Sequence, residues 1–400
     1  MKFSTLLLLL GGACSASDHP YTIVDTAQAQ YYDAQQTIDE PTVNESYFGQ
    51  DAHYNGHAPN YQNNNDGTIS DLITDLMWTR EPKTQLTHAE ALSGAKNCRI
   101  GGYTDWRLPT AKELYSLIQF NGIAPSPHQN NHENFTPFIN NEFFKFKYTQ
   151  ANKARRIFET PYATRTLDID TKHSIAPAYF GIDFANGQIK SYRLTDPNGK
   201  AETFSVLYVR GNINYGLNQF KDNLDGTITD TATGLTWMQN DSGQTMDWPA
   251  ALKYAASMKL AGYNDWRLPN AKELHSLVDY TRSPDSSDSA SIQSKFNATP
   301  IINEQGIKDY AYYWTSTSYI RPRHADRAVY IAFGRALSHV EDPLAGKEAW
   351  LNINGSGSQG SDLKSGAPEA SPEGRGPRSN VIRVNNMVRL VRGGTATSSE

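Results

Sequence analysis

The sequence Gly101-Gly102-Tyr103-Thr104-Asp105-Trp106-Arg107-Leu108-Pro109 reveals an internal repeat, because it recurs 160 residues later as Ala261-Gly262-Tyr263-Asn264-Asp265-Trp266-Arg267-Leu268-Pro269. Around these stretches, residues 91–120 and 251–280 are identical at 16 of 30 positions. The flanking motifs occur in the same order in both copies. A repeated unit of this size is a domain and not a short solenoid repeat.

Local signals within each unit predict an α+β domain. The Asp-Gly pairs at 66–67 and 225–226 precede Thr-Ile segments and are typical of hairpin turns. Thr110 with Glu113, and Asn270 with Glu273, have the spacing of a capping box. We therefore expect helices to begin near residues 111 and 271. With one further helix before each, every unit has two helices in a mainly antiparallel sheet.

Composition excludes several classes of protein. The chain has 400 residues, of which 38% are hydrophobic and 20% charged. This balance is too apolar for a disordered chain and too polar for a membrane bundle. The formal net charge is −5, which opposes non-specific binding to nucleic acid. We expect no nucleic-acid partner.

The first residues indicate export. Met1-Lys2 precede an apolar run that ends in Gly-Gly-Ala-Cys14, which is typical of a secretory signal. A cysteine after small residues also resembles a bacterial lipoprotein signal, in which Cys14 would carry lipid. The alternative is ordinary cleavage after Ala13 or Ala16, which would release the protein. No later stretch approaches about 18 consecutive apolar residues, so we expect membrane contact only through a lipid anchor.

The repeat also predicts the boundaries of the domains. One stretch, rich in glycine, serine and proline, has no counterpart in the first unit and predicts a flexible surface insertion. The expected segments are a signal peptide at 1–13, a linker at 14–48, a first repeat at 49–212, a second repeat at 213–394 with the insertion at 352–379, and a tail at 395–400.

The ordered motifs resemble a known family. An Asp-Gly-Thr turn, Gly-Leu-x-Trp, Asp-Trp-Arg-Leu-Pro, Tyr-Trp-Thr-Ser-Thr at 313–317 and Val-Arg-Leu-Val-Arg follow one another. The chain resembles a domain of unknown function, also described as the C-terminal domain of the Legionella collagen-like adhesin (Lcl). The resemblance implies two tandem C-type-lectin-like domains, export or surface attachment, and binding of sulfated polysaccharide. It supplies no catalytic residue or cofactor. Unlike that adhesin, this chain has no collagen-like tract and is acidic.

Residues present in both copies are interpreted as scaffold. A buried tryptophan beside an Asp–Arg pair would fix the loop before the second helix. The alternative is that the guanidinium and indole face a sugar or carboxylate. The residues assigned to this structural motif are Trp78, Asp105, Trp106, Arg107, Trp237, Asp265, Trp266 and Arg267.

Residues present in one copy are the candidates for recognition. The second unit holds aromatic residues that the first lacks, followed by a basic cluster that includes His324 and Arg327. We expect a sugar-stacking surface there, or alternatively a larger second core. The candidate ligand-binding residues are Trp314, Tyr313, Tyr319, Arg321, Arg323 and Trp350.

Catalytic and metal motifs find little support. The acidic turns, such as Asp222 to Asp230, fail the order of an EF-hand, so we expect no metal and no cofactor. If Cys14 is lipidated or removed, Cys98 is the remaining cysteine, and we expect it to be a buried hydrophobe. We expect a non-catalytic protein that binds a glycan or another extracellular partner. The alternatives are an envelope docking component and an enzyme with paired carboxylates, which leave no sequence signature.

Overall fold

The computed structural model describes residues 19–125, 135–148, 159–170, 177–196, 198–342, 346–366 and 379–394. The expected signal peptide, Cys14 and the tail at 395–400 lie outside the described residues. The fold is mostly antiparallel sheet and contains two repeated regions, as the sequence predicts.

Each repeat contains a small antiparallel sheet of four strands, in which the last strand of the repeat joins three strands from its beginning. The orders are β12-β5-β4-β3 in the first repeat and β13-β14-β15-β23 in the second. Gly67 and Gly226 have φ values of 88° and 87°, which confirms the hairpin turns expected at the Asp-Gly pairs. The strands are β3 (Tyr61–Asn63), β4 (Thr68–Asp71), β5 (Leu76–Thr79), β12 (Val209–Gly211), β13 (Phe220–Asp222), β14 (Thr227–Asp230), β15 (Leu235–Met238) and β23 (Val391–Arg392).

Two longer and two shorter helices repeat at equivalent positions. Thr110 and Asn270 each accept a hydrogen bond from the backbone of the glutamate three residues later, and that glutamate bonds back to the cap. Both expected capping boxes are thus confirmed, and they set where α2 and α4 begin. The helices are α1 (His88–Asn97), α2 (Ala111–Tyr115), α3 (Trp248–Ser257), α4 (Ala271–Ser276), α5 (Pro284–Ser287), η1 (Asp51–His53) and η2 (Ile100–Gly102).

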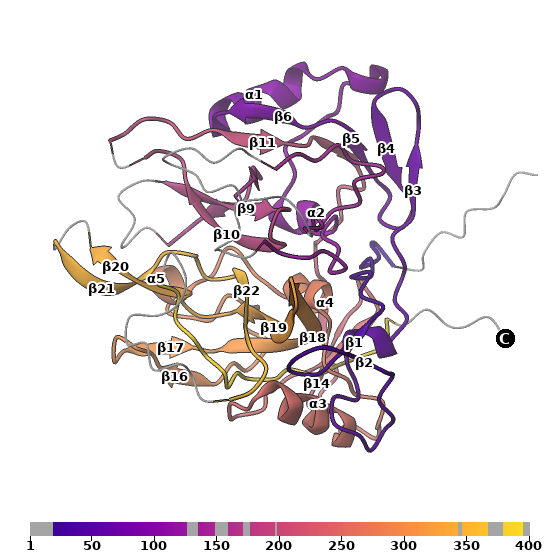
Figure 1. The fold of residues 1–400 in the computed structure, drawn as a ribbon, viewed down its shortest axis with the longest axis vertical. Helices are drawn as coiled ribbons and strands as arrows, with labels where there is room; N and C mark the ends of the chain where they lie inside the picture. Colours follow the sequence, from indigo (N-terminus) through magenta and orange to yellow (C-terminus); the bar gives the residue numbers. More distant parts are fainter. Residues whose placement is uncertain are drawn as a thin grey trace, which may run out of the picture.

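One large sheet runs through both repeats. Its order is β18-β19-β22-β10-β9-β7-β11-β6, with β8 also paired to β9, and β11–β7 is its one parallel pairing among the described strands. Helix α1 packs near β6 and α3 near β18, at opposite ends of the molecule (Figure 1). The strands are β6 (Lys83–Leu86), β7 (Pro161–Tyr162), β8 (Leu167–Asp168), β9 (Ala178–Asp183), β10 (Gln188–Arg193), β11 (Phe204–Val206), β18 (Tyr312–Arg321), β19 (His324–Ala332) and β22 (Gln359–Leu363).

Strand β22 corrects the expectation of a flexible insertion at 352–379. It pairs with β19 along residues 359–363 and with β10 at Ile189, and so joins the sheets of the two repeats. Glycine and serine suit this position because β22 is crowded: a side chain at Gly360 would collide with the ring of Tyr330. Residues 367–378 of the expected insertion lie outside the described part of the chain.

The expected linker at 14–48 also packs against both repeats over its described residues. The side-chain nitrogen of Gln28 donates to the carbonyl oxygens of Phe120 and Ser318, one in each repeat. Tyr21 and Val24 are buried. This segment therefore ties the repeats together. Its strands are β1 (Tyr31–Tyr32) and β2 (Thr37–Ile38). Two further hairpins are formed by β16 (Pro300–Ile302) with β17 (Lys308–Tyr310) and by β20 (Leu337–Asp342) with β21 (Lys347–Asn352).

Two lysines at equivalent positions cross between the repeats. Lys112 Nζ donates to the carbonyl oxygen of Ser276 at 2.7 Å, and Lys272 Nζ donates to that of Ser116 at 2.8 Å. Such reciprocal contacts are what a two-fold interface requires. The two repeats are therefore packed as a pseudo-symmetric pair and form one continuous body.

Candidate functional site

The structure buries the aromatic residues expected to bind sugar. Trp314 is 0% exposed, and its indole nitrogen donates to the carbonyl oxygen of Met246. Tyr313 donates to Asp241, and Tyr319 stacks on a phenylalanine ring in the core. The structure corrects this expectation, because β18 is covered on both faces of its sheet. Side chains on both sides of the strand are therefore buried, from Tyr312 to Tyr319.

The other three candidates lie nearer the surface. Arg321 binds both carboxylate oxygens of Asp326, at 2.8 and 3.0 Å. Arg323 is exposed at the β18–β19 turn with a φ of 63°. Trp350 is half-buried on the β20–β21 hairpin, where it packs against His339. The candidates are thus divided between two hairpins and do not form the single sugar-stacking surface expected for the second repeat.

The shared tryptophans are buried. Trp78 and Trp237 are 0% exposed and lie on β5 and β15. Trp106 and Trp266 donate from the indole nitrogen to the carbonyl oxygens of residues 100 and 260, at 3.1 and 3.2 Å. Each of the latter two therefore anchors the loop that follows the first helix of its repeat.

The arginines beside them have different partners from those expected. Arg107 pairs with Glu113, and Arg267 binds both oxygens of Glu273 at 2.6 Å. The sequence suggested pairing with the adjacent aspartate instead. Each arginine binds the glutamate of the following helix because the capping box holds the glutamate side chain beside the loop. The aspartates face outward and pair with other arginines.

The outward aspartates complete two equivalent, partly exposed clusters. Asp105 accepts from Arg210 at 2.7 Å, and its side chain is 58% exposed. The Arg210 guanidinium lies over the Tyr103 ring, with its carbon 3.8 Å from the centroid. Hydrogen bonding to Arg210 lowers the pKa of Asp105, so the carboxylate stays ionised. We call these three residues cluster 1.

The second repeat contains the same arrangement, cluster 2, formed by Tyr263, Asp265 and Arg392. Arg392 binds the two oxygens of Asp265 at 2.8 and 3.0 Å and lies 3.6 Å from the Tyr263 ring centroid. Tyr263 is 46% exposed. Hydrogen bonding to Arg392 lowers the pKa of Asp265 as well. The geometry is thus reproduced residue by residue.

Each cluster offers three kinds of contact at one surface point. The part of the ring that the guanidinium leaves uncovered offers an apolar surface, the carboxylate accepts hydrogen bonds and the guanidinium donates them. A sugar has a matching C–H face and hydroxyl groups. Sequence reasoning missed these clusters because it treated every shared residue as scaffold. The signal in the sequence was the spacing Tyr-x-Asp, which in both repeats is directly followed by a tryptophan that is buried.

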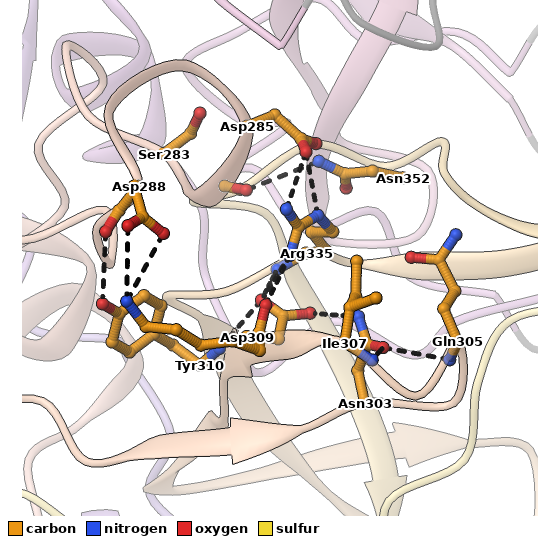
Figure 2. A network of polar contacts seen from close by, with 12 residues as sticks. Ser283, Asp285, Asp288, Asn303, Gln305, Ile307, Asp309, Tyr310, Arg335 and Asn352 are labelled. Carbon is orange, nitrogen blue, oxygen red and sulfur yellow. Dashed lines mark hydrogen bonds and ion pairs between the residues drawn. The ribbon is translucent and has the colours of Figure 1, made fainter.

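The buried carboxylates of the second repeat form a separate polar network. The Arg335 guanidinium lies between Asp285 and Asp309 (Figure 2), with an Nη2–oxygen distance of 2.7 Å to Asp285 and an ion pair of 3.5 Å to Asp309. Asp170 of the first repeat accepts from Ser283 and Asn352 of the second. Burial raises the pKa of Asp170 and of Asp309. Within this network the carboxylates have protein partners and join the repeats.

A small cavity lies where the repeats meet. It has a volume of about 20 Å³, which is room for one water molecule. Lys112 and Lys272 line it, with Tyr115 and His275. Burial lowers the pKa of Lys112 to about 8 and that of Lys272 to about 7. This space is too small for a substrate, so the paired lysines serve the contact between repeats.

Other sites suggested by the sequence have structural explanations. Asp225 accepts from the backbone and hydroxyl of Thr227, and Asp222 accepts from the backbone of Leu224, so the acidic turn bonds to itself. Among the residues that the structure describes, no three metal-binding side chains converge. Cys98 is buried. No described helix is long and apolar enough to cross a membrane.

Comparison with known proteins gives one result. The family model described as the Lcl C-terminal domain matches at two regions, residues 67–210 and 226–351. Both regions contain the Tyr-x-Asp segment of their repeat. No curated protein matches, and no solved structure matches.

Proposed function

The chain belongs to the Lcl C-terminal domain family, and on this premise we propose that it is a non-catalytic surface protein that binds carbohydrate. The proposal assigns recognition to clusters 1 and 2. The observation that carries it is their equivalence: each repeat presents an exposed aspartate beside a half-buried arginine and a tyrosine that is half-buried in cluster 1 and exposed in cluster 2, in one geometry. Scaffold alone does not require an ionised carboxylate to be half exposed at both places.

The chemistry of the clusters favours hydroxyl-rich sugars over sulfated ones. An ionised carboxylate accepts hydrogen bonds from sugar hydroxyls and repels sulfate. Each guanidinium is already neutralised by its aspartate. The formal net charge of −5 adds to the repulsion of polyanions. We therefore place neutral glycans ahead of the sulfated polysaccharide that the resemblance implies.

The fold and the compartment belong to the same proposal. Antiparallel sheets with two helices per repeat support a C-type-lectin-like fold. The apolar start and Cys14 support export and attachment through lipid at the cell envelope. The carboxylate network around Arg335 supports a structural role over catalysis, because its carboxylates are engaged by the protein.

A glycan array tests the proposal. Three proteins are applied to the array: the wild type, the double variant Tyr103→Ala with Tyr263→Ala, and the variant Ile302→Ala. Ile302 is 71% exposed on the β16–β17 hairpin and serves as a matched surface control. We expect wild type and control to bind the same neutral glycans and the double variant to lose at least tenfold in affinity.

Two results would contradict the proposal. Equal binding by the double variant would remove clusters 1 and 2 as the site. A blank array for all three proteins, with each of them folded, would favour the alternative role as a protein-docking component of the envelope.

A further inference from the structure

Each cluster is fixed in place by the first helix of its repeat. Trp106, which directly follows Asp105 in sequence, packs in one core cluster with Ala91 of α1. Trp266 packs in the equivalent way with Ala255 of α3. The positions of clusters 1 and 2 therefore follow the positions of α1 and α3.

These helices lie far apart. Helix α1 packs near β6 and α3 near β18, which are the first and last strands of an eight-strand path. Neighbouring strands are about 4.8 Å apart, so seven steps span about 34 Å. Figure 1 shows α1 and α3 at opposite ends of the long axis. Clusters 1 and 2 therefore lie toward opposite ends of the molecule.

The separation is held by the fold and not by a flexible linker. Strand β22 of the second repeat pairs with β10 of the first. Lys112 and Lys272 each donate to a carbonyl oxygen across the junction. Tyr115 stacks on His275 with centroids 4.0 Å apart. Because these contacts are buried between the repeats, the two clusters are held at a fixed separation.

We propose that one molecule bridges two separate carbohydrate chains, one at each end. This inference rests on the proposed function and specifies how the two binding sites of one molecule are used. Two sites on a flexible tether engage one chain and gain affinity by effective concentration. Two sites held apart at opposite ends join different chains or different particles. The protein is therefore a cross-linker of glycan-bearing surfaces.

Bead aggregation tests this mode. The probes are beads coated with mannan, dextran or heparin, mixed with wild type, Tyr103→Ala, Tyr263→Ala or Ile302→Ala. We expect wild type and Ile302→Ala to aggregate the beads that they bind. Each single variant should still bind those beads without aggregating them. With a tetrasaccharide of the bound coating, calorimetry should give about two sites for wild type and about one for each single variant.

The results separate the two levels of the proposal. If wild type binds beads with two sites per molecule but never aggregates them, bridging is wrong and carbohydrate binding stands. If single variants aggregate beads as well as wild type does, the two ends are not the sites of cross-linking. If no coating binds wild type and the array is also blank, carbohydrate binding itself fails, and bridging fails with it.

Discussion

The ring of Tyr115 stacks on that of His275, its equivalent in the second repeat, with centroids 4.0 Å apart. On either side of this stack, Lys112 and Lys272 reach across to carbonyl oxygens of the opposite repeat. Residues that a sequence reading would leave in solvent thus form the centre of the molecule. Their burial fixes the distance between clusters 1 and 2.

The lysine contacts predict a large stability effect. Lys272→Met should lower the free energy of unfolding by about 1–3 kcal/mol, because two buried carbonyl oxygens lose their donor. Urea unfolding measures this. Lys253 is exposed on α3, so Lys253→Met should change stability by no more than about 0.5 kcal/mol. Equal losses in the two variants would show that the crossing contact contributes nothing.

The same lysine predicts a pH dependence. The pKa of Lys272 falls from 10.5 to about 7 on folding because the side chain is buried. Between these values the unfolded chain binds the proton and the native protein does not, so stability rises with pH. The stability that the neutral Lys272 side chain allows is therefore lost progressively as pH falls from 10.5, and the loss is complete at about pH 7. Unfolding measured from pH 7 to 10 should show a steeper rise for wild type than for Lys272→Met, and parallel curves would refute this assignment.

Substitution of Trp314 should lower the stability of the fold and leave glycan binding by the folded protein unchanged. Trp314→Ala removes a fully buried indole and should cost about 3–5 kcal/mol of stability. Trp350→Ala, on a half-buried ring, should cost less. The comparison is thermal unfolding followed by array binding below the transition. Loss of glycan binding by a folded Trp314→Ala protein, with normal stability, would return recognition to β18.

Lipid attachment is tested by metabolic labelling. We expect a palmitate analogue to label the wild-type protein and the Cys98→Ser variant, and not Cys14→Ser. Cys98→Ser is the matched control because Cys98 is buried in the folded domain. Labelling of Cys14→Ser, or no labelling of wild type, would leave ordinary signal cleavage as the route of export.

Local sequence signals predicted local structure well. The capping boxes at Thr110 and Asn270 and the turns at Gly67 and Gly226 depend on a few neighbouring residues, and each formed as expected. The repeat predicted which residues are equivalent. The repeat did not predict which of these residues face water. Asp105 and Arg107 are two residues apart, yet the Asp105 side chain is mostly exposed and that of Arg107 is mostly buried against Glu113.

Contacts between segments that are distant in sequence could not be predicted from local sequence patterns. Gln359–Leu363 reads as loop because its composition suits a linker, yet it completes a sheet once β10 and β19 lie beside it. Trp314 looked available because the first repeat has no counterpart, although both faces of its strand are covered. Burial of this kind depends on packing that no local pattern encodes.

We propose that recognition occurs at clusters 1 and 2, the arrangement that both repeats share. A crystal structure of the protein with the oligosaccharide that the array selects tests it most directly. We predict a sugar ring against Tyr103 and a second against Tyr263, each with a hydroxyl bonded to the neighbouring aspartate. Sugar density at the Trp350 hairpin instead, with both tyrosines bare, would contradict the account.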